Sequence, residues 1–201
     1  MTFNFNNLSQ TAKETLFDAI SKEVSGQGDV VPSTTPVNAV AATATLTSDT
    51  NPPTDTKTVT IGDVVYTFVT ALTTDPAEVP YEVLIGTAAE SLDNLKSAIN
   101  GTAGEGTTYG TGTVAHPLVS ATTNTDTSQI IAVKIAGDTS IDVSTDDTSL
   151  SWDDTVTTNG VNGTVARAGQ IYFDTTNLYI ATADNTVAGA NWKKLTLEAI
   201  T

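Results

Sequence analysis

The single histidine of the chain, His116, is the first residue whose type could carry out chemistry. An imidazole serves as a general base beside a nucleophile or as one ligand of a metal site. One histidine cannot supply a two- or three-histidine metal centre, the chain has no cysteine, and no G-x-S-x-G elbow is present. Pro117 follows directly, and we therefore expect His116 to have a structural role in a loop or in packing.

Paired carboxylates are the second candidate. Asp146-Asp147 and Asp153-Asp154 flank Trp152 and could supply oxygen ligands to Ca²⁺. Their spacing does not match a calcium-binding loop of the EF-hand type, and paired aspartates in turns are common in a chain this acidic. We expect no metal site and no cofactor.

The glycine-rich stretch at residues 101–112, GTAGEGTTYGTG, is the third candidate and could suggest phosphate binding. Such loops bind phosphate when they open a helix, whereas this one follows a predicted helix and lacks the terminal GK[ST]. Glu105 would also repel a phosphate. We expect a flexible or turn-rich connection.

Four aromatic residues near the C-terminal end could form a sugar-stacking surface or a small core across strands: Tyr172, Phe173, Tyr179 and Trp192. We favour the core, because Trp and Tyr mostly serve burial and interfaces.

Composition narrows the function classes further. The 201 residues carry 8 Lys and Arg against 23 Asp and Glu, a formal net charge of −15. This charge argues against nucleic acid and against an anionic membrane surface as partners, because both require a basic surface. About one residue in five is threonine, which favours strands. No arrangement of side chains predicts an enzyme.

The elements that must position these residues begin with an N-terminal arm and amphipathic helix at residues 1–26. Thr11 and Glu14 have the spacing of a capping box, and the apolar residues that follow recur on one helical face. We expect this region to bind a neighbouring chain or to pack on its own domain. The candidate partner-binding residues are Phe3, Phe5, Leu16, Phe17, Ile20 and Val24. A Pro- and Thr-rich extended linker is predicted at residues 27–55, and Ala39–Leu46 within it is compatible with one strand.

A main domain is predicted at residues 56–160. Two alternating runs, 58–61 and 64–68, are separated by Gly62-Asp63 and predict a hairpin with a type II′ turn. A capping box at Thr87 and Glu90 opens a helix that ends at Gly101. Further strands are expected at 81–85, 118–122, 129–135, 140–144 and 148–152.

A smaller β-module is predicted at residues 161–201, with strands at 170–173, 178–180 and 192–197. We expect this β-meander to be too small to be stable alone, so it must pack on the main domain or form a trimer with copies of itself. The fold class is therefore α+β and predominantly β. We expect one antiparallel sheet with a packed helix, preceded by the N-terminal helix and arm and followed by a small β-meander.

Three stretches in order, TVTIGDVVYTF (58–68), YEVLIGTAAESLDNLKSAING (81–101) and GTTYGTGTVAHPLVSAT (106–122), resemble a module of structural proteins of tailed bacteriophages. Residues 168–197 resemble a short β-module of phage fibre and virion-surface proteins. The resemblance implies a virion component in many symmetric copies. We expect a capsid decoration (cement) protein, a homotrimer on the head surface that binds the major capsid protein and other virion proteins. The alternative is a tail or tail-fibre component for host-surface attachment.

Overall fold

The computed structural model describes residues 35–74, 79–174, 176–189 and 191–196. These residues form a β-rich α+β structure with one helix and mainly antiparallel sheets, as the sequence predicts. The expected arm and helix at residues 1–26, and the first part of the expected linker, lie outside the described residues. Among the described residues, no helix has the length and apolar character needed to span a membrane.

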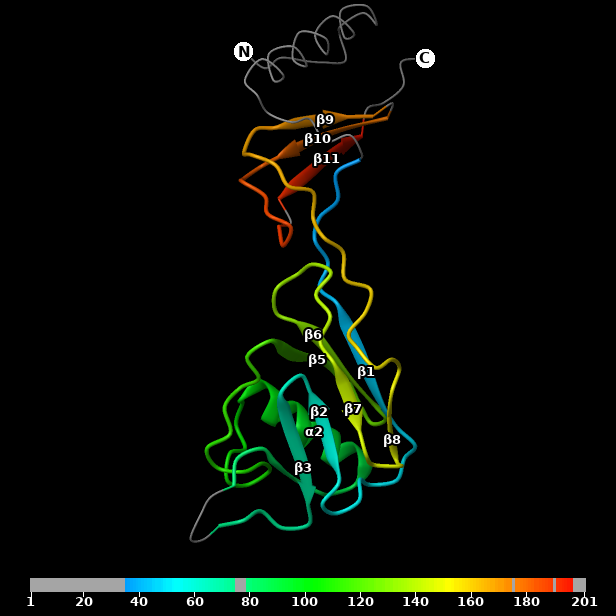
Figure 1. Ribbon diagram of the computed structural model, residues 1–201, viewed down its shortest axis with the longest axis vertical. Coiled ribbons are helices and arrows are strands. Elements are labelled where there is room, and N and C mark those ends of the chain that lie inside the picture. The colour runs from blue at the N-terminus through cyan, green and yellow to red at the C-terminus, as the bar shows by residue number, and fades with distance from the viewer. Residues whose placement is uncertain (1–34, 75–78, 175, 190, 197–201) are drawn as a thin grey trace, which may run out of the picture. The chain divides into compact units, whose positions relative to one another are not determined.

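The chain divides into two compact units (Figure 1). The larger unit spans Val40–Val161, and the smaller one comprises, in its described part, residues 35–39 and 162–196 with the gaps given above. The larger unit thus begins 16 residues before the predicted start at residue 56. The reason is a strand in the expected linker, Thr43–Ser48, which pairs with strands from the far end of the unit.

Two four-stranded sheets, in place of the single sheet expected, make up the larger unit. The first has the order β5-β6-β1-β8, with β5 at Val119–Thr125, β6 at Ser128–Val133, β1 at Thr43–Ser48 and β8 at Leu150–Trp152. The second has the order β4-β3-β2-β7, with β4 at Glu82–Leu84, β3 at Val64–Val69, β2 at Thr58–Ile61 and β7 at Val143–Thr145.

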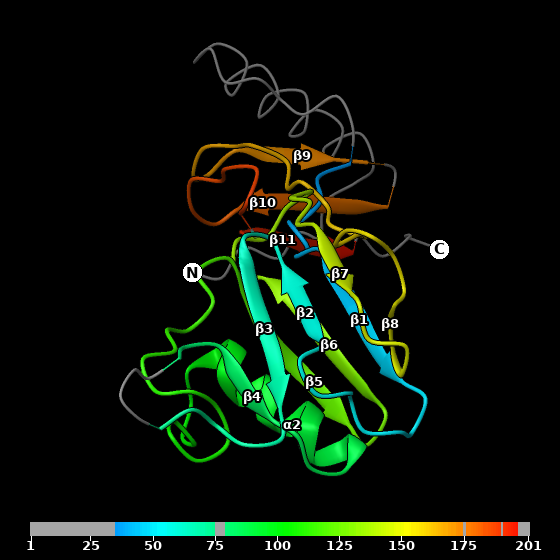
Figure 2. The ribbon, with the colours of Figure 1, turned by 60° about the horizontal axis from the view of Figure 1, so that its bottom comes forward.

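The two sheets meet at one edge and are bridged by the helix at the other. Edge strands β7 and β8 contact each other, and the Trp152 indole N–H donates to the Ser144 carbonyl at 3.1 Å. At the opposite edges, α2 (Ala88–Asn100) contacts β4 of one sheet and β5 of the other (Figure 2). Each sheet therefore buries one face against the other sheet and the helix.

Local sequence signals account for the hairpin and the helix. Ile61 pairs with Val64, so Gly62-Asp63 is a two-residue turn. A type II′ turn requires a positive φ at its first central residue only, and Gly62, with φ of +54°, meets this requirement, whereas Asp63 has no positive φ. The Thr87 hydroxyl accepts from the Glu90 amide and the Glu90 carboxylate accepts from the Thr87 amide, which completes the predicted capping box. Gly101 ends the helix in the left-handed region, at φ +60°.

Strand β4 differs from the expectation, because it pairs with β3 in parallel. A parallel pair requires a long crossover connection, and about a dozen residues separate β3 from β4. A short turn between two strands predicts that they pair in antiparallel. No such turn joins β3 to β4, so the local sequence did not indicate the direction of β4.

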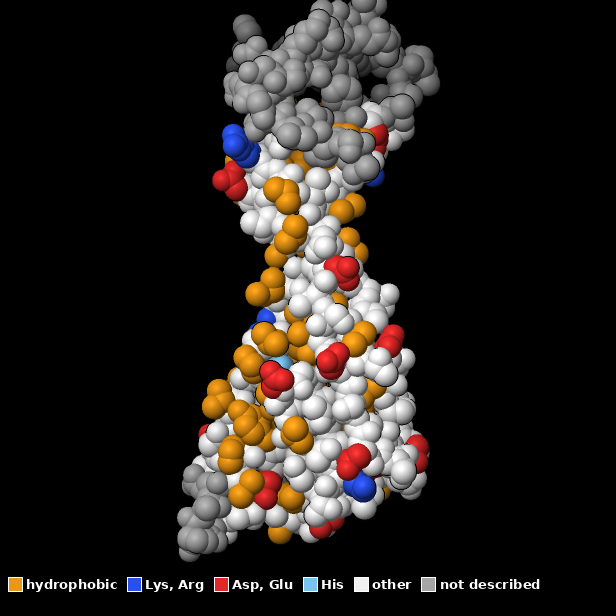
Figure 3. Space-filling view, viewed as in Figure 1, with side chains coloured by type: hydrophobic (Ala, Val, Ile, Leu, Met, Phe, Trp, Pro, Cys, Tyr) orange, Lys and Arg blue, Asp and Glu red, His pale blue; other side chains and the backbone are white. Residues whose placement is uncertain are grey.

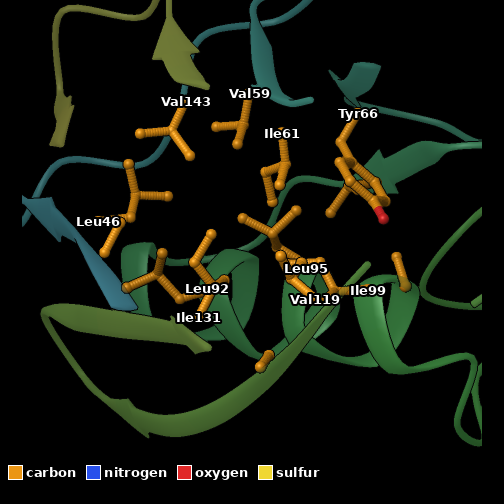
Figure 4. Packing of buried hydrophobic residues seen from close by; sticks show 14 of the residues in the cluster. Leu46, Val59, Ile61, Tyr66, Leu92, Leu95, Ile99, Val119, Ile131 and Val143 are labelled. Atoms are coloured by element: carbon orange, nitrogen blue, oxygen red, sulfur yellow. The ribbon is translucent and has the colours of Figure 1, made fainter. Parts of the chain in front are cut away.

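The core of the larger unit lies between the sheets and α2. Leu92, Leu95 and Ile99 lie on the inner face of the helix and point toward Val59 and Ile61 of β2 (Figure 4). All five side chains are fully buried. The i, i+3, i+7 spacing of the helical residues provides this continuous apolar face.

The smaller unit contains a three-stranded antiparallel meander in the order β11-β10-β9. Its strands are β9 at Ile171–Phe173, β10 at Asn177–Ala181 and β11 at Trp192–Thr196. The carboxylate of Asp174 accepts hydrogen bonds from the amides of Thr176 and Asn177 and so forms the turn between β9 and β10.

Candidate interaction surface

His116 is a buried structural residue three positions before β5, with 1% of its surface exposed. Its Nδ1 accepts from the amides of Leu118 (3.2 Å) and Val119 (3.1 Å), so the ring proton is on Nε2. Nε2 donates to the Ile61 carbonyl oxygen at 3.0 Å. Both nitrogens are therefore bound to the backbone. Burial, aided by the positive charge of Lys134, lowers the pKa of His116, although the hydrogen bond to Ile61 acts in the opposite direction.

Each of the four aspartates considered for calcium accepts a hydrogen bond from a backbone amide. Asp147 is buried and accepts from the Ser149 amide, the Ser149 hydroxyl and the Thr54 amide at 2.6–2.7 Å. Burial acts to raise its pKa, but these hydrogen bonds outweigh it and lower the pKa. Asp146 accepts from the amide and hydroxyl of Thr58 and forms an ion pair with Lys57 at 3.6 Å.

Asp153 and Asp154, the second pair of aspartates, also accept hydrogen bonds from backbone amides. Asp153 accepts from the Thr45 amide at 2.9 Å, and Asp154 accepts from the Thr155 amide at 2.7 Å. In the part of the chain that the structure describes, no three metal-binding side chains are grouped. Asp146 and Asp153 bind amides of β2 and β1, whereas Asp147 and Asp154 bind amides outside the strands.

The glycine-rich stretch is a network of turns packed against β4. The Gly104 carbonyl accepts from the amides of Thr107 and Thr108, and the Glu105 carboxylate accepts from the Gly112 amide at 2.7 Å. The Tyr109 side chain is buried in the core, and its hydroxyl donates to the Thr102 carbonyl. The stretch is turn-rich, and its one carboxylate binds its own backbone.

The aromatic residues of the smaller unit form part of a core. Trp192 is buried and its indole N–H donates to the Thr164 carbonyl at 3.0 Å. Tyr179 is also buried and lies against Tyr172, with ring centroids 5.8 Å apart. Phe173 is the fourth member of the predicted set, and its side chain lies outside the description. A buried Trp192 offers no open face for a sugar ring.

The candidate partner-binding residues Phe3, Phe5, Leu16, Phe17, Ile20 and Val24 lie outside the described residues. The described part of the larger unit has an exposed apolar surface of its own. Figure 3 shows hydrophobic side chains gathered along one side of this unit.

Four exposed aliphatic residues lie near one end of the first sheet, and we call them the apolar end: Val40 (52% exposed), Leu118 (47%), Ile135 (65%) and Val161 (40%). The Leu118 carbonyl accepts from the amide of Lys134, the residue before Ile135. Gly137 donates to the Val40 carbonyl, and Val40 donates to the Val161 carbonyl. Backbone pairing therefore places these four positions, which lie far apart in the sequence, near one end of the first sheet.

Sequence reasoning did not single out the apolar end. Val40 precedes β1, Leu118 precedes β5 and Ile135 follows β6, so each lies just beyond a strand. Only the antiparallel pairing of these strands brings their ends to one place. Comparison with protein-family models, curated proteins and solved structures finds no match to this chain.

Proposed function

We propose that this chain is a structural component of a tailed-bacteriophage virion, a decoration protein that binds the major capsid protein and neighbouring copies on the head. The proposal rests first on the resemblance of residues 58–122 to a module of phage structural proteins. The homotrimer expected from the sequence is part of the same proposal.

The observation that carries the proposal is the apolar end. Large aliphatic residues exposed in a group are typical of a surface that another protein covers, since burial contributes about 25 cal/mol for each Å² of apolar area. Val40, Leu118, Ile135 and Val161 are large, exposed aliphatic residues whose backbones lie near one end of the first sheet.

The described polar residues favour a binding role over catalysis. His116, Asp146, Asp147 and Asp153 are each bound to backbone groups. Their geometry serves the fold, and no step of a reaction follows from it. The proposed mechanism is non-covalent: exposed apolar residues are buried between subunits, and the buried area holds adjacent capsid subunits together.

The alternative, a tail or tail-fibre component, predicts glycan binding through Trp192. The burial of that side chain gives this alternative less support than the head assignment.

The copy number of this chain in purified particles tests the proposal. A decoration protein is expected in hundreds of copies over the head, and quantitative mass spectrometry together with imaging of the particles measures this. A handful of copies on a tail would favour the alternative, and absence from particles would refute both.

A binding experiment tests whether the apolar end contacts the capsid. Ile135→Asp should weaken binding to heads that lack this protein, because it places a charge in the buried contact. Thr127→Asp, at an exposed position in the turn between β5 and β6, is the matched control and should bind normally. Equal binding by the two variants would remove the apolar end from the proposal.

A further inference from the structure

Three Asn-Gly pairs occur in the sequence, at residues 100–101, 159–160 and 162–163. An asparagine before a glycine is prone to deamidation, because glycine has no Cβ to keep its backbone nitrogen away from the asparagine side chain. Each pair also follows a β-branched residue, Ile99, Thr158 or Val161, so the local sequence does not rank the three. The folded structure does rank them, because the reaction needs two free groups: the side-chain amide of the asparagine and the backbone nitrogen of the glycine.

Deamidation has two steps and consumes only water. The glycine nitrogen bonds to Cγ of the asparagine, the Cγ–Nδ2 bond breaks, and Nδ2 leaves as ammonia with the proton that the glycine nitrogen loses. Water then opens the resulting succinimide ring: its hydroxyl adds to one of the two carbonyl carbons, and its proton goes to the ring nitrogen. Opening at the side-chain carbonyl gives aspartate. Opening at the main-chain carbonyl gives isoaspartate, in which the chain continues through Cβ and Cγ.

Asn100 is held at both reacting groups. Its Nδ2 donates to the Ala121 carbonyl at 3.0 Å, and its Oδ1 accepts from the Ala121 amide at 2.9 Å. The Gly101 amide donates to the carbonyls of Ser97 and Ala98 at the end of α2. Ring closure would require the loss of both contacts with β5 and of the helix end, so the fold protects this pair.

The pair Asn162-Gly163 is held at its nucleophile. The Gly163 amide donates to the Val187 carbonyl at 2.7 Å. The nitrogen that must attack Cγ is therefore bound, and this bond must break before the ring can close.

Neither reacting group is held in this way at Asn159-Gly160. Asn159 is exposed, and the one hydrogen bond of its side chain among the described residues runs from Nδ2 to the hydroxyl of its neighbour Thr158, at 3.2 Å. In the described part of the chain, the Gly160 amide donates to no acceptor. The close approach of the Gly137 carbonyl is on the side where a Cβ would lie, so it does not bind this nitrogen.

We propose that Asn159 is the deamidation site of the folded chain, with isoaspartate among its products. The modification site is assigned by the hydrogen bonds that protect the other two pairs and are missing here. This inference does not depend on the proposed function.

The isoaspartate product has a structural consequence, because the chain is fixed on both sides of the site. Thr158 and Thr43 exchange two backbone hydrogen bonds at 2.8 and 2.9 Å, and Val161 and Val40 exchange two at 2.9 Å. Isoaspartate at position 159 adds one atom to the main chain between these pairs. One of the two pairs must then lengthen or break, so the isoaspartate form of the larger unit should be less stable.

Incubation of the full chain in mildly alkaline buffer, followed by peptide mapping with mass spectrometry, tests the site. The same incubation in guanidinium chloride is the control, because the three pairs of the unfolded chain differ little in sequence and should convert at similar rates. In the folded chain we expect Asn159 to convert about tenfold faster or more than Asn100 and Asn162, because the loss of one or more hydrogen bonds opposes ring closure at those two.

Two outcomes of this experiment would overturn the assignment. One is conversion of Asn100 or Asn162 in the folded chain as fast as that of Asn159. The other is retention of all three amides in the folded chain over the time in which the unfolded chain converts.

Asn159→Asp is the matched variant for the structural consequence. It carries the charge of the deamidated chain without the additional main-chain atom. Anion-exchange chromatography isolates the converted chains through their added charge, and the peptide map gives their isoaspartate content. Urea denaturation should show a lower midpoint for the isoaspartate-containing fraction than for Asn159→Asp. Equal midpoints would overturn the predicted loss of pairing at Thr158 or Val161.

Discussion

The ring of His116 donates from Nε2 to the carbonyl oxygen of Ile61, 55 residues earlier, at 3.0 Å. This bond joins the segment that leads into β5 of one sheet to the end of β2 in the other. Because Nδ1 accepts two amide protons at the same time, the imidazole holds three backbone groups.

Replacing His116 should therefore destabilise the larger unit. His116→Ala leaves the amides of Leu118 and Val119 without their acceptor and removes a hydrogen bond to the Ile61 carbonyl, and we expect a loss of about 2–4 kcal/mol in the free energy of unfolding. His116→Asn can still accept from the two amides but cannot reach Ile61, so it should lose about half as much. Urea denaturation measures both, and equal losses would contradict the role of Nδ1.

The stability should also depend on pH through this residue. Because the pKa of His116 is lowered in the folded protein, the unfolded chain binds a proton near pH 6.5 that the folded chain does not. The free energy of unfolding should therefore decrease as the pH falls from 7 toward 5. His116 is the single histidine, so this decrease should disappear in His116→Asn. A dependence that persists in the variant would assign it to other groups.

At lower pH, the protonation of carboxylates such as Asp174 is expected to change the free energy of unfolding. The amides of Thr176 and Asn177 and the Asn177 side chain hold the pKa of Asp174 at about 2, although partial burial acts to raise it. The stabilisation by this carboxylate is complete above the ordinary aspartate pKa and is lost as the pH falls toward 2. Carboxyl carbon resonances followed by NMR should show Asp174 titrating last among the exposed aspartates. An ordinary titration near pH 4 would contradict the turn geometry.

Calcium should leave the stability unchanged, because the Asp147 oxygens are bound to Thr54 and Ser149. Neither millimolar Ca²⁺ nor a chelator is expected to shift the melting temperature. Asp147→Ala, in contrast, should lower the free energy of unfolding by about 2–4 kcal/mol, because three donors lose their acceptor. A melting temperature that rises with Ca²⁺ would restore the metal hypothesis.

Gly160 should tolerate no side chain. A Cβ at this position would lie 2.2 Å from the Gly137 carbonyl oxygen and 3.0 Å from the Ala42 side chain. Gly112 has open space around the same position, and its φ of +81° alone opposes a substitution. We therefore expect Gly112→Ala to cost about 1 kcal/mol and Gly160→Ala to cost more, as measured by urea denaturation. The opposite order would contradict the close approach at Gly160.

Much of the secondary structure was predictable from local sequence. The Gly62-Asp63 turn, the capping box of Thr87 and Glu90 and the helix stop at Gly101 each depend on residues within a few positions of one another. Such signals act through backbone geometry and short-range hydrogen bonds, so they can be recognised in the sequence without knowledge of the rest of the fold.

Long-range pairing was decided only in the tertiary structure. The sequence by itself did not determine that β4 runs parallel to β3, that β1 of the expected linker lies inside a sheet, or that the strands form two sheets. It also did not indicate that Asp147 holds the amide of Thr54, 93 residues earlier. Nor did it indicate that Val40, Leu118, Ile135 and Val161 lie near one end of the first sheet. These relationships depend on which strands pair and in which direction. Alternation of apolar and polar residues along a strand indicates only that one of its faces is buried, and it does not indicate which partner covers that face.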